Sequence, residues 1–274
     1  MIDSINVSLL KQWIECPTKA YYQSILRRVP PTKPKALDLG TMWHQAMWAR
    51  SNNLDVKEVL DALDIPAETW TEWDNTLARA LPLVEFMEGE EELAAEKQLS
   101  IPRFIKGLPL VGTLDNIVKW NGKIWHRQYK TLGGTTPVAI FAELQRTDWH
   151  ECGYHKMLQL EYPEETIGGT ILYIVRKLSP TRFRDNPAGC IVPPLIMARS
   201  QDIVDEALDD MYDVAMNLFK SLHEIPMPLR YPHSCGGPFR NSMCSYREVC
   251  YGNKKISSTD FITAEPRYVI PEAN

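Results

Sequence analysis

Residues 110–131 read LVGTLDNIVKWNGKIWHRQYKT, two runs rich in β-branched and aromatic residues joined by Asn121-Gly122. An Asn-Gly pair between such runs predicts a two-residue type I′ turn, because both turn positions need a positive φ. The stretch therefore predicts a β-hairpin, and its turn fixes how the two strands pair.

The pairing of this hairpin brings polar residues together on one face. If the two residues that flank the turn pair, Ile117 lies opposite His126. Asp115 then lies opposite Gln128, and such cross-strand partners share a face with Cβ atoms ~4.5–5.5 Å apart. Lys130 follows Gln128 by two positions and points to that same face. We expect Asp115, Gln128 and Lys130 to form one cluster.

An Asp, an amide oxygen and a Lys on adjacent strands suit the hydrolysis of phosphodiesters. Carboxylate and amide oxygens can hold a hard divalent cation, and such a cation activates water and neutralises charge that develops on phosphate. The lysine can orient the nucleophile or stabilise the pentavalent state. A surface salt bridge between Asp115 and Lys130 is the alternative that the hairpin alone leaves open.

Helical patterns surround the hairpin along the chain. Ser8 is the predicted N-cap of a first helix, and a second helix is expected to follow Asp38 and to carry His44. Residues 54–90 read as helices with an acidic outer face. Apolar residues recur with a period of about 3.6 over 203–222, which predicts a long amphipathic helix.

These patterns predict one α/β domain over residues 1–274, with a mixed central sheet flanked by helices. Within it we expect a helical insertion at 36–90 and a catalytic core at 110–178. The composition agrees with a globular protein, because 44% of the 274 residues are hydrophobic and 24% are charged. Such values exclude a disordered chain or a collagen-like one.

The location of the protein is predicted from what the sequence lacks. It has no apolar run of about 18 residues, the length that suggests a membrane span. The first residues lack the basic start and the apolar stretch of a signal peptide. We expect a soluble, cytoplasmic protein of a prokaryote or a phage, with no membrane partner.

The chain has a net charge of −5, but it contains one local run of basic residues. No acid occurs between Pro17 and Leu37, whereas Lys19, Arg27 and Arg28 lie there. Local basic patches can contact a phosphate backbone even on an acidic protein. A solvated surface without a partner is the alternative interpretation.

Four cysteines are divided between the two ends of the chain. Cys16 lies near the start, and Cys235, Cys244 and Cys250 crowd near the end. Without an export signal, metal ligation or burial explains cysteines better than disulfides do. A zinc site of the last three with His233 is one interpretation, but it leaves the first cysteine unexplained.

Four motifs follow one another between these cysteines. They are Gly40-Thr41-Met42-Trp43-His44, Gly112-Thr113-Leu114-Asp115, Gln128-Tyr129-Lys130 and His150-Glu151-Cys152-Gly153-Tyr154. In this order, and with the divided cysteines, the chain resembles the PD-(D/E)XK nuclease superfamily in its RecB-like branch. AddB-type helicase–nuclease subunits and CRISPR-adaptation nucleases are the members that it resembles in pattern, from about residue 8 to 250.

The resemblance implies a restriction-endonuclease-like core and a set of site residues. The ligands of Mg²⁺ or Mn²⁺ would be the side chains of His44, Asp115 and Gln128 and the carbonyl of Tyr129. Lys130 would serve catalysis.

The resemblance also implies contacts to DNA and a second cofactor. His150 and Tyr154 would contact the DNA strand or support the metal site, and the basic run would add contacts to phosphate. The four cysteines would hold a 4Fe–4S cluster that ties residue 16 to a region at 233–252.

Two positions depart from the pattern of the family. Gln128 stands where the family prefers Asp or Glu, and His150 stands where it prefers Gln. An amide keeps an oxygen ligand but lacks the negative charge, so we expect weaker metal binding unless an acid such as Glu96 supplies the charge. Tyr154, and not His, closes the motif that starts at His150-Glu151, which excludes a zinc-peptidase site.

The predicted activity is that of a metal-dependent DNA nuclease, with an exonuclease on single strands or DNA ends as the first interpretation. Gln128 keeps open the alternative of a weakened nuclease fold that binds DNA ends without cutting. An RNA nuclease is a third interpretation. The chain lacks Gly-x-x-x-x-Gly-Lys-[Ser/Thr], so a helicase or recombination partner would be a separate chain.

Overall fold

The computed structural model describes residues 2–31, 35–133, 136–178, 180–224, 244–252, 255–257 and 259–264. By its internal contacts the chain divides into two compact units. Unit 1 comprises Met1–Lys33, Pro102–Leu110 and Asp209–Asn274, and unit 2 comprises Pro34–Ile101 and Val111–Leu208. The single domain with an insertion at 36–90 and a core at 110–178 stays a prediction.

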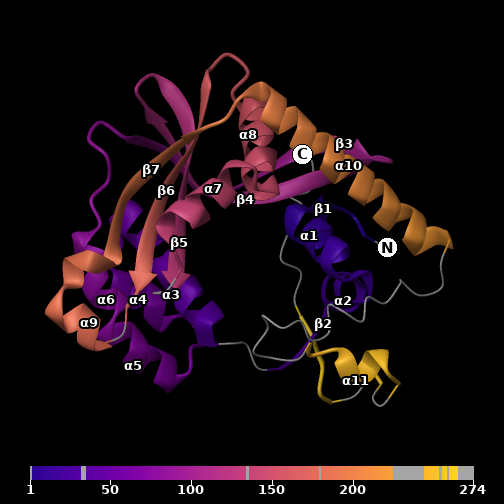
Figure 1. The fold of residues 1–274 in the computed structure, drawn as a ribbon, viewed down its shortest axis with the longest axis horizontal. Helices are drawn as coiled ribbons and strands as arrows, with labels where there is room; N and C mark the ends of the chain where they lie inside the picture. Colours follow the sequence, from indigo (N-terminus) through magenta and orange to yellow (C-terminus); the bar gives the residue numbers. More distant parts are fainter. Residues whose placement is uncertain are drawn as a thin grey trace. The chain divides into compact units, whose positions relative to one another are not determined.

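Short runs of strands and of helices follow one another along the chain (Figure 1). The strands are β1 (Ile5–Asn6), β2 (Arg28–Val29), β3 (Glu91–Ile105), β4 (Leu108–Trp120), β5 (Lys123–Gly133), β6 (Ile167–Lys177), β7 (Ile191–Ala198) and β8 (Ile262–Thr263). The α-helices are α1 (Val7–Glu15), α2 (Pro17–Ala20), α3 (Lys35–Ser51), α4 (Val56–Asp61), α5 (Ala67–Asn75), α6 (Leu77–Ala80), α7 (Val138–Arg146), α8 (Trp149–Glu161), α9 (Pro180–Asp185), α10 (Gln201–Glu224) and α11 (Arg247–Cys250). Single turns of π or 3₁₀ helix occur at Tyr21–Ile25, Leu81–Leu83 and Pro187–Cys190.

The first helix begins earlier than the sequence pattern predicts. Its N-cap is Asn6, whose side-chain oxygen accepts a hydrogen bond from the Leu9 backbone N–H at 2.8 Å. The predicted cap, Ser8, lies inside α1. Both residue types cap helices well, so sequence alone does not choose between two such neighbours.

The main sheet is mixed, as the sequence predicts. Its strand order is β1-β4-β5-β6-β7, and β3 pairs with β4 outside this path. The pairs β4–β5 and β6–β7 are antiparallel, whereas β5 and β6 are parallel and are joined through α7 and α8. A helical crossover between parallel neighbours is what this topology requires.

The hairpin pairs as predicted. Asn121 and Gly122 have φ values of 49° and 70°, the positive values that a type I′ turn demands. Ile117 is paired with His126, and the next pair along the ladder is Asn116 with Arg127. The predicted register is therefore confirmed as far as Asn116 and Arg127, the pair next to Asp115 and Gln128.

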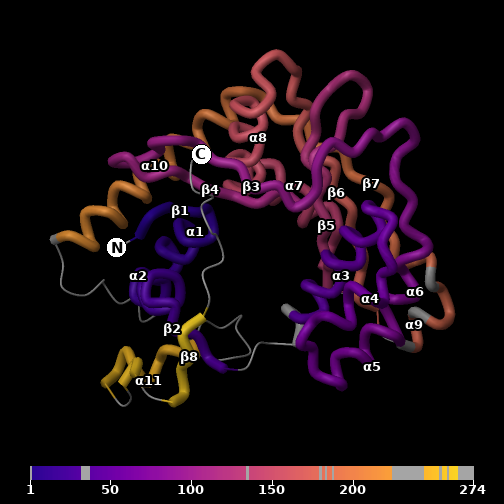
Figure 2. The backbone as a smooth tube through the Cα atoms, turned by 180° about the vertical axis from the view of Figure 1, so that it is seen from behind, coloured from indigo at the N-terminus to yellow at the C-terminus, as the bar shows by residue number. Residues whose placement is uncertain are grey.

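The sheet of unit 2 carries a different layer of helices on each face (Figures 1 and 2). One face packs against α3, α5 and α6 in a large apolar cluster that includes Trp43, Trp73 and Tyr129. On the other face, Leu172 and Met197 of the sheet pack with Phe141 of α7. Side chains alternate along each strand, so neighbouring residues of β5 enter different layers.

Unit 1 joins the two ends of the chain. Strand β2, near the start, pairs with β8, near the end, as Figure 2 shows. The guanidinium of Arg28 donates to the carbonyl of Ile256 at 3.2 Å, to the carbonyl of Phe261 at 2.7 Å and to Oγ1 of Thr263 at 2.9 Å. In return Tyr246 donates its hydroxyl proton to the Arg28 carbonyl at 2.6 Å. The C-terminal segment is thus hydrogen-bonded to the N-terminal one.

Among the described residues, no helix has both the length and the apolar character that a membrane crossing requires.

Candidate active site

The centre of the candidate site is Asp115, on β4. Its Oδ2 lies 3.2 Å from Nδ1 of His44, which α3 supplies. The same oxygen accepts a hydrogen bond from the backbone N–H of Tyr129, on β5, at 3.0 Å. Helix α3 and the β4–β5 hairpin, which are far apart in the sequence, therefore meet at one carboxylate, and two of the predicted metal ligands are already in contact.

The surroundings of Asp115 favour its charged form. Burial by itself raises the pKa of the Asp115 carboxyl. The hydrogen bond and charge of His44, the charge of His126 and the N–H of Tyr129 outweigh that effect and hold the pKa below its usual value. An ionised carboxylate is the form that ligates a cation.

Gln128 lies in the same unit and is almost completely buried. Its Oε1 has no hydrogen-bond partner in the part of the chain that the structure describes. A buried amide oxygen without a partner costs free energy, and a bound cation or an ordered water would satisfy it. Gln128 therefore fits the role of an uncharged oxygen ligand. Lys130, two residues further along β5, is half-buried.

Glu96 can supply the charge that Gln128 lacks. It lies on β3, where its φ of 48° departs from regular strand geometry. Burial and the charge of Asp115 raise the pKa of the Glu96 carboxyl, whereas the charge of His44 lowers it. The charges of both His44 and Asp115 thus act on the Glu96 carboxyl, although these three described side chains are not grouped as ligands of one metal ion.

Two of the sequence motifs meet through Gly112 and Tyr154. A Cβ placed on Gly112 would lie 2.4 Å from Cε1 of Tyr154, far closer than atoms can approach. Glycine is therefore required in β4 so that this ring of α8 can lie on the strand. The Tyr154 ring also stands edge-on to His126 at 5.0 Å and lies 6.2 Å from the ring of His150.

Gly40 and His150, the first residues of two of the sequence motifs, do not share the close packing of Gly112 against Tyr154. An ideal Cβ on Gly40 meets nothing within 4 Å, which leaves open space one helical turn before His44 on α3. His150 lies at the start of α8, where its backbone N–H donates to Oδ1 of the N-cap Asp148 at 2.8 Å. Its ring Nδ1 lies 3.3 Å from the same oxygen.

A buried charged network centred on Arg127 of β5 has no counterpart among the sequence predictions. Arg127 donates to Glu90 at 3.0 Å and is also paired with Glu92. Glu90 in turn accepts the hydroxyl proton of Tyr173 at 2.7 Å, and Arg127 also donates to Ser51 at 2.9 Å. The network ties α3 and the start of β3 to the strand that carries Gln128.

The predicted contacts to phosphate lie in unit 1. Lys19, on α2, is 3.9 Å from Glu15, the last residue of α1. Arg27 is exposed and has a φ of 53°. Arg28 is engaged with the C-terminal segment through three hydrogen bonds, a structural role that competes with the predicted contact to DNA.

The described cysteines of the predicted cluster also lie in unit 1. Cys16 and Cys250 are buried and Cys244 is half-buried. Cys244 and Cys250 belong to one apolar cluster with Tyr22. The prediction for Cys235 falls outside the described residues, as does His233. No three His, Cys, Asp or Glu side chains of the described chain are grouped to hold a metal.

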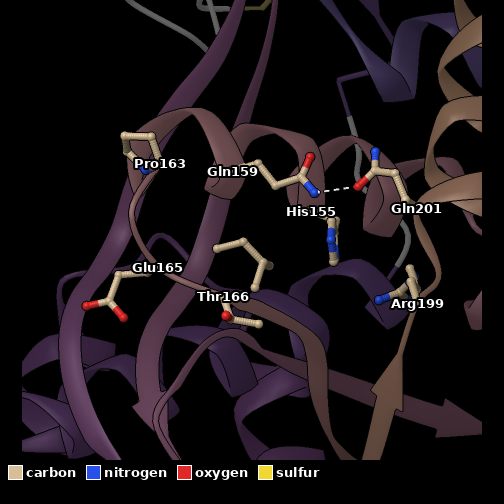
Figure 3. Close-up of a pocket in the computed structure, with 8 residues that line it drawn as sticks. His155, Gln159, Pro163, Glu165, Thr166, Arg199 and Gln201 are labelled. Atoms are coloured by element: carbon tan, nitrogen blue, oxygen red, sulfur yellow. Dashed lines mark hydrogen bonds between the residues drawn. The ribbon is translucent and has the colours of Figure 1, made fainter.

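A separate hollow of about 440 Å³ lies in unit 2 (Figure 3). Its lining includes His155 and Gln159 of α8, Gln201 of α10 and Arg199. Gln159 donates to Gln201 at 2.7 Å. Burial and the charges of Arg199 and Lys156 lower the pKa of His155 to about 4, so this imidazole is neutral at physiological pH.

A mixed sheet flanked by helices, with an acid, an amide and a lysine on one hairpin, agrees with the nuclease class that the sequence predicts. The family model supports the same class, and it matches residues 4–251. The chain belongs to the PD-(D/E)XK nuclease superfamily. This membership supports a phosphodiester hydrolase.

A solved structure shares the fold. It is the crystal structure of a candidate exonuclease from Eubacterium rectale, with a TM-score of 0.55 and 13% sequence identity. The similarity covers 92% of this chain and 88% of that one. At this identity the likeness shows the fold alone. The comparison with curated proteins found no match.

Proposed function

We propose that the protein is a divalent-cation-dependent DNA nuclease, and that it acts as an exonuclease on single strands or DNA ends. The observation that carries the proposal is the Asp115 carboxylate, held between His44 and the Tyr129 N–H at 3.2 and 3.0 Å. The strand that supplies this N–H also carries Gln128 and Lys130. The Eubacterium rectale protein that shares the fold is a candidate exonuclease, which supports an exonuclease over other kinds of nuclease.

The donor set of the site fits Mg²⁺ or Mn²⁺. Asp115, the unpartnered Oε1 of Gln128, the Tyr129 carbonyl and His44 would hold the cation. When bound, the cation lowers the pKa of a water ligand and neutralises charge on the phosphate. Glu96 adds a nearby carboxylate, which raises the attraction for a divalent cation.

The chain's own residues would divide the remaining work. His44 and the Tyr129 N–H fix the orientation of Asp115, so that its second oxygen is presented to the site. Lys130 would stabilise the negative charge of the transition state or orient the attacking water. His150 and Tyr154, on the helix that lies on β4, would contact the strand.

Substitution of the central carboxylate tests the proposal. Asp115→Asn keeps the shape of the side chain and removes the charge, and Lys130→Ala removes the ammonium. Each should abolish cleavage of labelled DNA in Mg²⁺ or Mn²⁺ while the circular dichroism spectrum stays that of the parent. Cleavage that persists in Asp115→Asn would move the active site elsewhere.

The same assay separates the alternatives. The substrates are labelled single-stranded DNA, double-stranded DNA and RNA, each with a free or a blocked end. We expect cleavage of DNA, and only from free ends. Cleavage confined to RNA would favour an RNA nuclease. Binding of DNA ends without cleavage in either metal would favour the binding module that Gln128 keeps open. Added helicase or recombination proteins can then be tested as separate partners.

We also propose a 4Fe–4S cluster in unit 1. The proposal is supported by the presence of Cys16, Cys244 and Cys250 in one compact unit, although they come from opposite ends of the chain. Cys235 is the fourth candidate. Protein purified without oxygen should be brown and should contain about four irons per chain. Cys16→Ala should lose the iron. Stoichiometric zinc without iron would instead favour the zinc interpretation.

A further inference from the structure

Glu151, on α8, is a buried carboxylate with an unusual set of partners. Its side chain is only 1% exposed. One of its oxygens, Oε2, accepts the hydroxyl proton of Thr170, on β6, at 2.6 Å. The same oxygen lies 3.4 Å from Nδ1 of His126, on β5. The helix is therefore attached to two adjacent parallel strands through one carboxylate.

Arg199, just beyond β7, completes this group. Its Nη1 donates to the Thr170 hydroxyl at 2.8 Å, so Thr170 accepts from the guanidinium and donates to Glu151. Nη2 lies 3.9 Å from Glu151. Two further N–H groups of Arg199 donate to the carbonyls of Gln145 and Arg146 at 2.8 and 3.1 Å. These carbonyls end α7, where a helix leaves its acceptors unsatisfied and favours positive charge.

The group therefore fixes α7 and α8 on the sheet at once. Both helices end or begin within a few residues of it, and α8 carries His150 and Tyr154. Tyr154 follows Glu151 by less than one helical turn and fits onto Gly112 with no room to spare. A small shift of α8 along the sheet would change how these two side chains meet a bound strand.

We propose that Glu151, Thr170 and Arg199 are positioning residues that set α8, and with it His150 and Tyr154, for binding of the DNA strand. This inference rests on the proposed function. The three residues act through α8 and do not touch the reacting atoms. Their loss should therefore raise KM and leave kcat nearly unchanged.

The experiment measures KM, kcat and the urea midpoint for a short set of variants. Thr170→Val removes the bridging hydroxyl and keeps both charges. The double variant Glu151→Leu with Arg199→Met removes both charges together, because a buried pair replaced by apolar side chains often keeps or gains stability, whereas one partner left alone is costly. Thr76→Val is the matched control for Thr170→Val, since the Thr76 hydroxyl is also buried but donates to the carbonyl of Glu72, on α5, at 2.6 Å.

Loss of one charge-assisted hydrogen bond corresponds to about a tenfold change in an equilibrium constant. We expect KM to rise about tenfold in Thr170→Val and in the double variant, and to stay that of the parent in Thr76→Val. The double variant separates the two roles, because we expect its free energy of unfolding to be close to that of the parent while its KM stays raised.

Two results would overturn the inference. A double variant with the KM of the parent would show that the group stabilises the fold and no more. A fall in kcat at constant KM would place its effect on the chemical step. Failure of the proposed function would look different, because the parent protein would not cleave, or its cleavage would survive Asp115→Asn.

Discussion

His155 should make the stability of unit 2 depend on pH. Its imidazole is buried and its pKa is lowered to about 4, from an ordinary value of 6.5, by burial and by the charges of Arg199 and Lys156. Between these two values the unfolded chain binds a proton at His155 that the folded chain does not bind. The free energy of unfolding therefore falls as the pH falls through this range.

The size of the effect follows from the pKa difference. A difference of one in pKa corresponds to about 1.4 kcal/mol. Acidification from pH 6.5 to pH 5 should cost about 2 kcal/mol at this residue, and the full loss near pH 4 should reach about 3 kcal/mol. Asp115 and Glu151 have lowered pKa values, so their contributions to stability disappear only below the ordinary carboxylate range.

Urea unfolding at a series of pH values, followed by tryptophan fluorescence, measures this loss. The variant His155→Gln replaces the ring with a neutral side chain and should lose about 2 kcal/mol less than the parent between pH 6.5 and pH 5. His223→Gln is the control, because His223 is exposed at the end of α10. Parallel pH curves for the parent and His155→Gln would refute the reasoning.

Three further outcomes are expected. Gly112→Ala should cost roughly 1–3 kcal/mol of stability because its Cβ would collide with Tyr154, whereas Gly40→Ala should be tolerated; equal urea midpoints for the two variants would contradict this contact. Arg28→Ala should release the segment around Phe261, and limited proteolysis followed by mass spectrometry should find new cuts there, which Arg27→Ala should not produce. Gln128→Glu should lower the Mg²⁺ concentration needed for half-maximal cleavage, since it adds a charged oxygen beside Asp115; an unchanged metal dependence would mean that this side chain does not face the cation.

The sequence predicts the hairpin because its information is local. The Asn121-Gly122 turn determines which residues pair, and the alternation of side chains then assigns Asp115 to its face. The contact of His44 with Asp115 follows from no local rule, because α3 and β4 are far apart in the sequence. The resemblance to a nuclease family supplied that pair.

The buried ionic groups escape sequence analysis for the same reason. Nothing local joins Glu151 to Arg199, or Arg127 to Glu90, since each side chain alone is typical of a protein surface. Gly112 is different, because the sequence singles it out as part of a motif. Only the structure explains it, through the ring of Tyr154 that lies where a Cβ would be.

The Arg127 network has a consequence for how β5 pairs with its neighbours during folding. Successive residues of β5 enter opposite layers, so His126 is paired with Glu151 on one side while Arg127 is paired with Glu90 on the other. A slip of β5 by one residue would exchange the two sides. It would leave buried charges without partners, and each such charge costs several kcal/mol. The cost of these unpaired charges disfavours a misaligned hairpin, so the native register of the strand that carries Gln128 and Lys130 is the stable one.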